Sequence, residues 1–312
     1  MTTCEVLRAG PMTTVQDWPG RLGYWKVGVP PSGPMDDLSF RLANLAVGNP
    51  EGAAGLEATL AGPSLRFDEA VVVAVTGAPV RVTIAGRVVP QWVPLHVAAG
   101  EVLDVGAVGE LGMRVYIAIA GGIGAQEYLG SRATFTLGRF GGHDGRVLVD
   151  GDTLSCSGAG TAERAPRRIL SDEQPALSND WQLAVTMGPH GAPEFFTDTD
   201  IDDLLGTAYE VHFNSDRTGI RLIGPQPRWA RADGGEATRE FLNVVARSRP
   251  AIQKCYEQAL KKNNGLQAKT VTLSVEANFT TTGQYKSSNF APSLGDGYGG
   301  TFDQLAEHLA KR

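Results

Sequence analysis

The chain between residues 56 and 157 consists of short β-branched segments, each closed by a turn that contains glycine. In order, they are "SLRFDEAVVVAVTG", "VRVTIAGRVVPQWVPLHVAAG", "EVLDVGAVGELGMRVYIAIAGG" and "GRVLVDGDTLSCSG". Strands at regular spacing with glycine turns are typical of a sandwich or barrel, and no helical pattern separates them as a βαβ sheet would need. The segment therefore predicts a mainly β fold.

One helix is expected early in the chain, at about residues 36–47. Asp36 or Asp37 can cap its N-terminus and Gly48 can end it. We expect its apolar face to consist of Leu38, Leu42, Leu45 and Ala46. Directly before it lies "GVPPSGPM", a rigid loop with three prolines and two glycines.

Changes in composition divide the chain into four expected parts. Residues 1–157 form a first β domain, and the polar, proline-containing residues 158–180 form a linker. Residues 181–237 form a second β segment, which the short helix "TDTDIDDLLG" interrupts. From residue 238 to 312 we expect a small α+β segment: a helical stretch broken by Pro250, then the strand "KTVTLSVEANF".

Composition excludes several classes of function. The formal net charge of −6 does not suit a nucleic-acid-binding protein, which would normally present a basic surface. The first residues do not resemble a secretory signal, and the longest apolar run, "AVVVAVTGAPV", is too short to span a bilayer. Three distant cysteines predict no disulfide framework, and five histidines without ligand spacing predict no metal site. We therefore expect a cytoplasmic protein.

Several long motifs resemble one family in the family's order. They are "TTVQDWPGRLGYWKVGVPPSGPMDDLSFRLANLAVGNPEGAAGLEATLAGPSLRF", "YIAIAGGI", "YLGSRATFTLGRFGGHDGRVLVDGD", "GPHGAPEFFTDTDIDDLL" and "VHFNSDRTGIRLIGPQPRWARADGGEA". Over about residues 4–237 the chain resembles the carboxyltransferase region of urea carboxylase. That region belongs to a wider family with KipA, allophanate hydrolase subunit 2 and the C subunit of 5-oxoprolinase.

This resemblance implies cyclophilin-like β-barrel domains and the transfer of a carboxyl group from carboxybiotin to urea, which gives allophanate. Biotin would be carried by a separate carrier domain, because no Met-Lys dipeptide of the carrier type occurs here. The implied partners are biotin carboxylase and biotin-carrier domains or subunits, or a KipI-like subunit. No nucleic acid or membrane partner is expected.

Beyond "GGEA" the sequence departs from the family. The segment that would complete the second barrel is missing, and residues of about 238–312 resemble instead the TonB-like C-terminal domain of AgmX/PglI-type proteins. We therefore interpret the chain as a chimera with a junction near Ala237. Two alternatives to the urea carboxylase function follow: a component of an ATP-dependent complex that resembles the C subunit of 5-oxoprolinase, or a catalytically incompetent chain with a partner-binding tail.

The loop "VPPSGPMDD" is the first candidate site segment. Backbone N–H groups at a helix start can bind an oxyanion, Gly33 would let a substrate approach the backbone, and Ser32 offers a hydroxyl. Asp36 is assigned here as a catalytic residue. The alternative is a rigid connector that fixes the angle of the helix, with Asp36 only as its cap.

The turn "TTVQDWPGRLG" is the second candidate. Arg21 could bind a carboxylate through both guanidinium nitrogens, and Asp17 could orient it. The alternative is a salt bridge within the turn.

The third candidate, "GSRATFTLGRFGGHDGR", holds arginines, His143 and Asp144 among glycines. Guanidinium groups suit carboxylate or bicarbonate-like ligands, and His143 could act as a base. The many glycines of this segment indicate that another group approaches its backbone closely. The alternative is a surface hairpin with solvated charges.

The fourth candidate, "FNSDRTGIRL", could bind urea through the amide of Asn214, or form a turn at the end of a strand. From the four segments we predict two sets of residues. The catalytic set is Ser32, Asp36, Arg146 and Arg217. The substrate-binding set is Arg21, Gly33, His143, Asn214 and Asp216.

Overall fold

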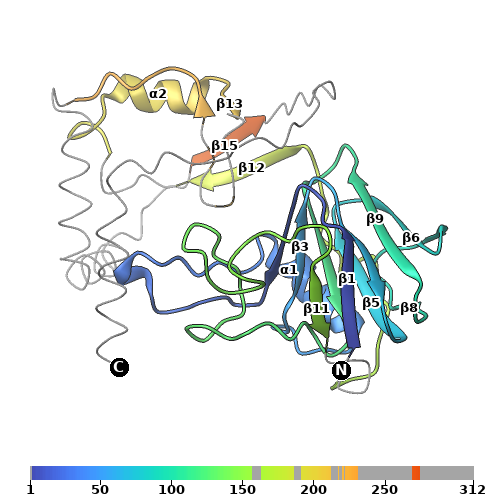
Figure 1. The fold of residues 1–312 in the computed structure, drawn as a ribbon. Helices are drawn as coiled ribbons and strands as arrows, with labels where there is room; N and C mark the ends of the chain where they lie inside the picture. Colours follow the sequence, from blue (N-terminus) through green and yellow to red (C-terminus); the bar gives the residue numbers. More distant parts are fainter. Residues whose placement is uncertain are drawn as a thin grey trace. The chain divides into compact units, whose positions relative to one another are not determined.

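The computed structural model of the chain describes residues 2–156, 163–185, 191–211, 217, 220, 222–230 and 269–274. For 180–185 and 269–274 it describes only the backbone. The described residues fall into two compact units, one up to residue 178 and one from residue 179. Each unit is described by itself (Figure 1).

Unit 1 is built on two antiparallel sheets. The six-stranded sheet has the order β11 (Thr153–Cys156), β1 (Thr2–Arg8), β4 (Ser64–Phe67), β9 (Val102–Val108), β6 (Val80–Ile84) and β7 (Arg87–Val89). The five-stranded sheet has the order β2 (Met12–Gln16), β3 (Gly55–Thr59), β10 (Arg114–Ile119), β5 (Val71–Gly77) and β8 (Leu95–Val97). The predicted mainly β class is confirmed.

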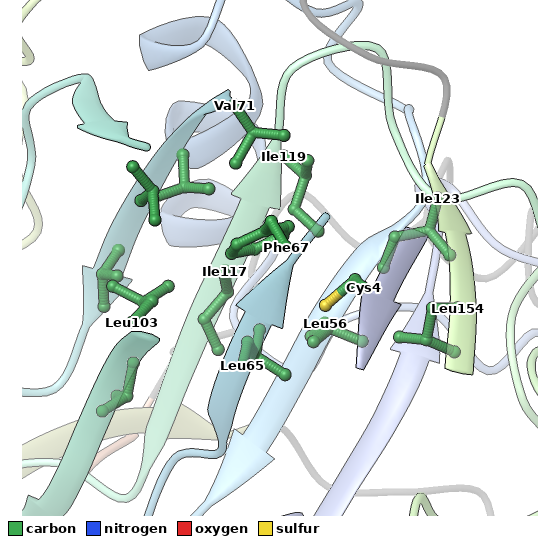
Figure 2. Close-up of a cluster of buried hydrophobic side chains, with 14 of the residues drawn as sticks. Cys4, Leu56, Leu65, Phe67, Val71, Leu103, Ile117, Ile119, Ile123 and Leu154 are labelled. Carbon is green, nitrogen blue, oxygen red and sulfur yellow. The ribbon is translucent and has the colours of Figure 1, made fainter. Parts of the chain in front are cut away.

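Side chains from both sheets form one hydrophobic core. Leu65 and Phe67 of the first sheet meet Leu56 and Ile117 of the second, and these side chains are at most 1% exposed (Figure 2). Burying each large apolar side chain contributes about 1.5–3 kcal/mol. The core between the sheets is therefore the main source of stability in this unit.

Strand β5 is buried along its whole length, which explains the long apolar run in the sequence. Val71, Val73 and Val75 face the core between the sheets. Val72 and Ala74, on the opposite face of the strand, pack in a second cluster with helix α1 (Asp37–Ala46). Because successive strand residues point to opposite faces, a strand covered on both sides can be apolar throughout.

Helix α1 confirms the expected helix at 36–47. The Asp36 side chain accepts a hydrogen bond from the Ser39 N–H at 3.0 Å, and Gly48, at a φ of 81°, follows the last turn. The expected apolar face is only partly correct, because Leu38 is 43% exposed. Phe40 points inward instead and meets Tyr116 of β10 edge to face, with ring centroids 5.9 Å apart.

Within the expected linker, residues 163–178 belong to unit 1 and lie along it. Ile169 is completely buried in the cluster beneath α1, and its N–H donates to the Trp92 carbonyl at 2.9 Å. The Arg167 N–H donates to the carbonyl of Ala46 at the end of α1, and the Arg167 side chain pairs with Glu173 at 2.8 Å. These contacts attach the segment to the helical face of the unit.

Unit 2 contains β12 (Asp180–Val185), α2 (Asp198–Gly206), β13 (Glu210–Val211), β14 (Leu222–Ile223) and β15 (Lys269–Ser274). Thr197 and Asp200 form a reciprocal capping box at the start of α2, as a threonine followed three residues later by an acidic residue allows. Strand β12 pairs antiparallel with β15, from Asp180 opposite Ser274 to Val185 opposite Lys269. The helical stretch expected after residue 237 lies outside the described residues.

Within the described residues, none of the helices has the length and apolar character needed to cross a membrane, and no cluster of three or more acidic, histidine or cysteine side chains could hold a metal ion. Cys4 and Cys156 are buried free thiols. They lie diagonally across the β1–β11 pair, since Thr2 faces Cys156 and Cys4 faces Leu154. Cys255 lies outside the described residues.

The burial of Phe40 gives a first test. Replacing Phe40 by Ala should lower the free energy of unfolding of unit 1 by about 3–5 kcal/mol, because it removes a buried ring and leaves a cavity between α1 and β10. Replacing the exposed Leu38 by Ala is the matched control and should change it by less than about 0.5 kcal/mol. Urea denaturation followed by tryptophan fluorescence measures both. Equal effects of the two substitutions would contradict this docking of α1.

Candidate functional site

Two of the expected site segments lie together in a projection that we call the arm, residues 17–35 and 124–147. Both leave the sheets on the same side, and they are the blue and green loops in Figure 1. A small apolar cluster joins them, in which Val27 and Val29 of the first loop pack against Leu129, Phe135 and Phe140 of the second. The arm therefore has a core of its own.

In the loop "VPPSG", two consecutive residues, Ser32 and Gly33, have positive φ values of 57° and 82°. The Gly33 N–H donates to the Gln16 side chain at 3.0 Å. A Cβ at Gly33 would lie 3.3 Å from the backbone oxygen of Asp17. Gly33 is buried, so the group that approaches its backbone in this structure is the neighbouring turn.

Buried polar side chains hold the start of α1. The Met35 N–H donates to Glu57 at 2.8 Å, and the Asp36 N–H donates to the Tyr116 hydroxyl at 2.8 Å. Burial, and secondarily the Glu57 carboxylate, raises the pKa of Tyr116 and keeps this hydroxyl neutral. Asp36 is occupied as the cap of the helix. Protein groups thus already bind the N–H groups of Met35, Asp36 and Ser39 that were expected to face an oxyanion.

Arg21 is completely buried. Its guanidinium group donates to the carbonyls of Tyr128 at 3.1 Å and Ala133 at 2.8 Å, and lies over the Phe140 ring. Asp17 does not pair with it directly, because its carboxylate accepts hydrogen bonds from Ser131 and from the Arg132 N–H, each at 2.6 Å. This burial does not fit direct contact between Arg21 and a substrate.

His143 and Arg146 come together around Asp152, which the sequence did not single out. Arg146 binds both carboxylate oxygens of Asp152, at 2.7 and 2.8 Å, and His143 Nε2 lies 3.4 Å from one of them. Hydrogen bonding from Arg146 lowers the pKa of Asp152 to about 2, against the opposing effect of burial. The result is a constantly ionised carboxylate beside a half-buried imidazole.

A cavity of about 330 Å³ lies between the second loop of the arm and the edge strand β11. His143, Asp144, Gln126 and Ser155 supply polar groups to its wall, and Ile123 and Leu154 supply apolar ones. This volume is at the lower end of the range for small-molecule sites. Of the predicted site residues that the structure describes, only His143 lines this cavity. Ser32, Gly33 and Asp36 lie along the first loop.

The glycines around His143 serve the packing of their own loop. A Cβ at Gly142 would overlap the Thr134 side chain, and a Cβ at Gly145 would overlap the backbone of Arg139. Both glycines have positive φ values, which other residues adopt only with strain. The close backbone approach expected from the sequence is therefore made by the loop itself.

The fourth candidate segment belongs to unit 2. Arg217 lies in a turn and is half-buried. Asn214 and Asp216 lie outside the described residues.

A family model described as "Carboxyltransferase domain, subdomain A and B" matches residues 27–252. The match covers more than half of the chain and includes the arm from Val27 onward, with parts of both units. The chain belongs to this carboxyltransferase family.

Two kinds of relative are similar to this carboxyltransferase-family chain. It is 46% identical over 240 residues to the urea amidolyase of Saccharomyces cerevisiae, which covers 75% of this chain and 13% of that protein. It is 32% identical over 222 residues to the C subunit of 5-oxoprolinase from Escherichia coli, which covers 70% of this chain and 68% of that protein. The chain therefore spans only a small part of the first relative and most of the second.

The solved structure of the Kluyveromyces lactis urea carboxylase is also similar. It has a TM-score of 0.71 and 46% sequence identity, over 75% of this chain and 22% of that chain. This chain and the Kluyveromyces lactis protein are therefore similar in sequence as well as in fold.

The pH dependence of the Asp152 cluster gives a second test. A carboxylate with a lowered folded-state pKa stabilises the fold above its unfolded pKa of about 3.9, and this contribution is lost as the pH falls to about 2. Asp152→Asn should therefore cost about 1 kcal/mol at pH 7, and its difference from the wild type should shrink between about pH 4 and pH 2.

Asp144→Asn is the control, because Asp144 is also near Arg146, at 3.8 Å, but is 76% exposed. Denaturant unfolding at several pH values measures the three proteins. A constant difference between Asp152→Asn and the wild type down to pH 2 would contradict the assignment.

Proposed function

We propose that the chain is the carboxyltransferase part of a urea carboxylase-like enzyme, which transfers a carboxyl group from carboxybiotin to urea to give allophanate. The observation that carries this proposal is the 46% identity to a urea amidolyase over 240 residues. The solved urea carboxylase with a TM-score of 0.71 supports it. The cyclophilin-like barrel architecture that the family resemblance implies is part of the same proposal.

Carboxybiotin, held on a carrier domain outside this chain, would supply the carboxyl group. The cavity beside the arm would accept a small ureido group, because its lining combines the apolar Ile123 and Leu154 with the polar His143, Gln126 and Ser155. The partners in this proposal are biotin carboxylase and carrier domains or subunits.

In the proposed reaction, a urea nitrogen would bond to the carboxyl carbon as the bond between that carbon and the biotin nitrogen breaks. His143 would take the proton that urea loses and return it to the biotin nitrogen. Nε2 faces the ionised Asp152, which leaves Nδ1 as the nitrogen that can accept a proton. The Asp152 carboxylate would then stabilise the imidazolium. Arg146 holds Asp152 in place from the other side, so we now propose a positioning role for it.

The remaining residues keep proposed roles according to their chemistry. Ser32 would offer its hydroxyl to the substrate from the first loop of the arm, with Gly33 beside it. For Asn214, Asp216 and Arg217 we propose, from the chemistry of these residues alone, the recognition of amide and carboxylate groups.

A component that resembles the C subunit of 5-oxoprolinase is the second candidate. The specific observation in its favour is coverage, since the chain spans 68% of the Escherichia coli protein but only 13% of the urea amidolyase. In this case the chain would act with a KipI-like partner subunit on 5-oxoproline.

The choice of substrate tests the proposed function directly. The full chain is combined with biotin carboxylase and biotinylated carrier from a urea carboxylase, ATP and bicarbonate. We expect urea to accelerate the loss of the carboxyl group from the carrier and allophanate to form, with no response to 5-oxoproline. A response to neither substrate would support the catalytically incompetent chain, and a 5-oxoproline response that needs a KipI-like subunit would support the second candidate.

The role of His143 gives a further prediction. His143→Gln should lower kcat for urea-dependent transfer by about 10²–10⁴, the usual contribution of a general base, while the midpoint of unfolding changes little. His96→Gln is the matched control, because His96 is an exposed histidine on β8. Equal rates for His143→Gln and His96→Gln would exclude His143 as the base.

A further inference from the structure

We infer that Arg21 is a positioning residue, whose buried guanidinium group holds the second loop of the arm and thereby fixes His143. Its catalytic consequence rests on the proposed function, but its effect on the place of His143 does not. The sequence had suggested a substrate ligand at this position. Complete burial and contacts with the protein on several sides point to a different role.

Arg21 connects both loops of the arm. Its backbone N–H donates to the carbonyl of Pro31 in the first loop at 2.6 Å. Its side chain reaches the second loop, where Nε donates to Tyr128 and Nη2 donates to Ala133. The guanidinium carbon also lies 4.8 Å from the centre of the Phe140 ring, within the range of a cation–π interaction.

Asp17 completes this attachment with the opposite charge. Its carboxylate accepts hydrogen bonds from the Ser131 hydroxyl and from the Arg132 N–H. These two residues directly precede Ala133, whose carbonyl Arg21 binds. Burial lowers the pKa of Arg21, and the Asp17 charge acts against that effect. A buried cation and a buried carboxylate thus hold the segment 131–133, through the Ser131 hydroxyl, the Arg132 N–H and the Ala133 carbonyl.

The segment 131–133 is in turn connected to His143. The carbonyl of Arg132 accepts a hydrogen bond from the Gly142 N–H at 2.9 Å, and Gly142 directly precedes His143. Gly141 lies so close to the guanidinium that a Cβ there would be 2.7 Å from Arg21 Nη2. A displacement of residues 131–133 would therefore move residues 141–143.

The contacts require an arginine. A planar guanidinium group can donate to two separate carbonyls and lie flat over an aromatic ring, whereas a lysine ammonium is a single point charge. Arg21 Nη1 is buried without a hydrogen-bond partner among the described residues, which costs free energy. The buried arginine is therefore accounted for by the contacts of its Nε, its Nη2 and its guanidinium plane.

The test uses the full chain with labelled histidine, in which His143→Gln assigns the His143 signal in nuclear magnetic resonance spectra. In Arg21→Ala we expect the His143 signal to shift and guanidinium ion, at concentrations far below denaturing ones, to return it toward the wild-type position. Sodium chloride at equal concentration should not return the signal toward that position. Arg87→Ala is the control, because the Arg87 side chain is 75% exposed and should leave the signal unchanged.

Arg21→Lys is the second variant, because it retains the charge without the planar fork. It should keep the fold and still displace the His143 signal. In the urea-dependent assay, both Arg21 variants should lower kcat by about 10–100-fold with little change in KM for urea, as expected when a catalytic group is misplaced by about 1 Å.

An unchanged His143 signal in both variants, or a shift that guanidinium does not reverse in Arg21→Ala, would overturn the inference. Global unfolding of both variants would also overturn it, because Arg21 would then stabilise the whole unit. A shifted and rescued signal in a chain that transfers no carboxyl group would retain the positioning role and reject the proposed function.

Discussion

The burial of β5 and β10 on both faces is the constraint on which the rest of unit 1 depends. One face of each strand packs into the core between the sheets, and the other must be covered by α1. An uncovered face would expose Val72, Ala118 and the Tyr116 ring. Because α1 has to lie there, its N-terminus is fixed, and the loop that precedes it must end at that point.

The arm is stabilised in a different way. It has almost no regular secondary structure, so side chains must satisfy many of its backbone groups. Asp17, Arg21, Gln16 and Glu57 do so from buried positions. Aromatic packing around Phe140 adds apolar contacts. A loop held in this way is rigid enough to present a histidine at a defined place, which a solvated hairpin would not be.

The sequence pattern predicted most of the regular structure in unit 1. Alternating or continuous β-branched runs gave the strands, and the capping residues gave the helix within one residue at each end. The face of the helix was less predictable, since Leu38 and Phe40 are both apolar and only the neighbouring sheet decides which is buried. The sequence also showed the polar loops. It could not show which polar side chains are buried and hydrogen-bonded within those loops.

The candidate site, like the fold, was predictable from the sequence only in part. Composition and motif order determined the carboxyltransferase family and the segments that matter, because these depend on residue types in a linear order. Only the tertiary structure placed Asp152 beside His143 and Arg146, and enclosed Arg21 against partners more than 100 residues further along the chain. Hydrogen-bond partners and burial are properties of positions in space. The same arginine in the same turn can bind a ligand or hold a loop, and the packing around it decides which.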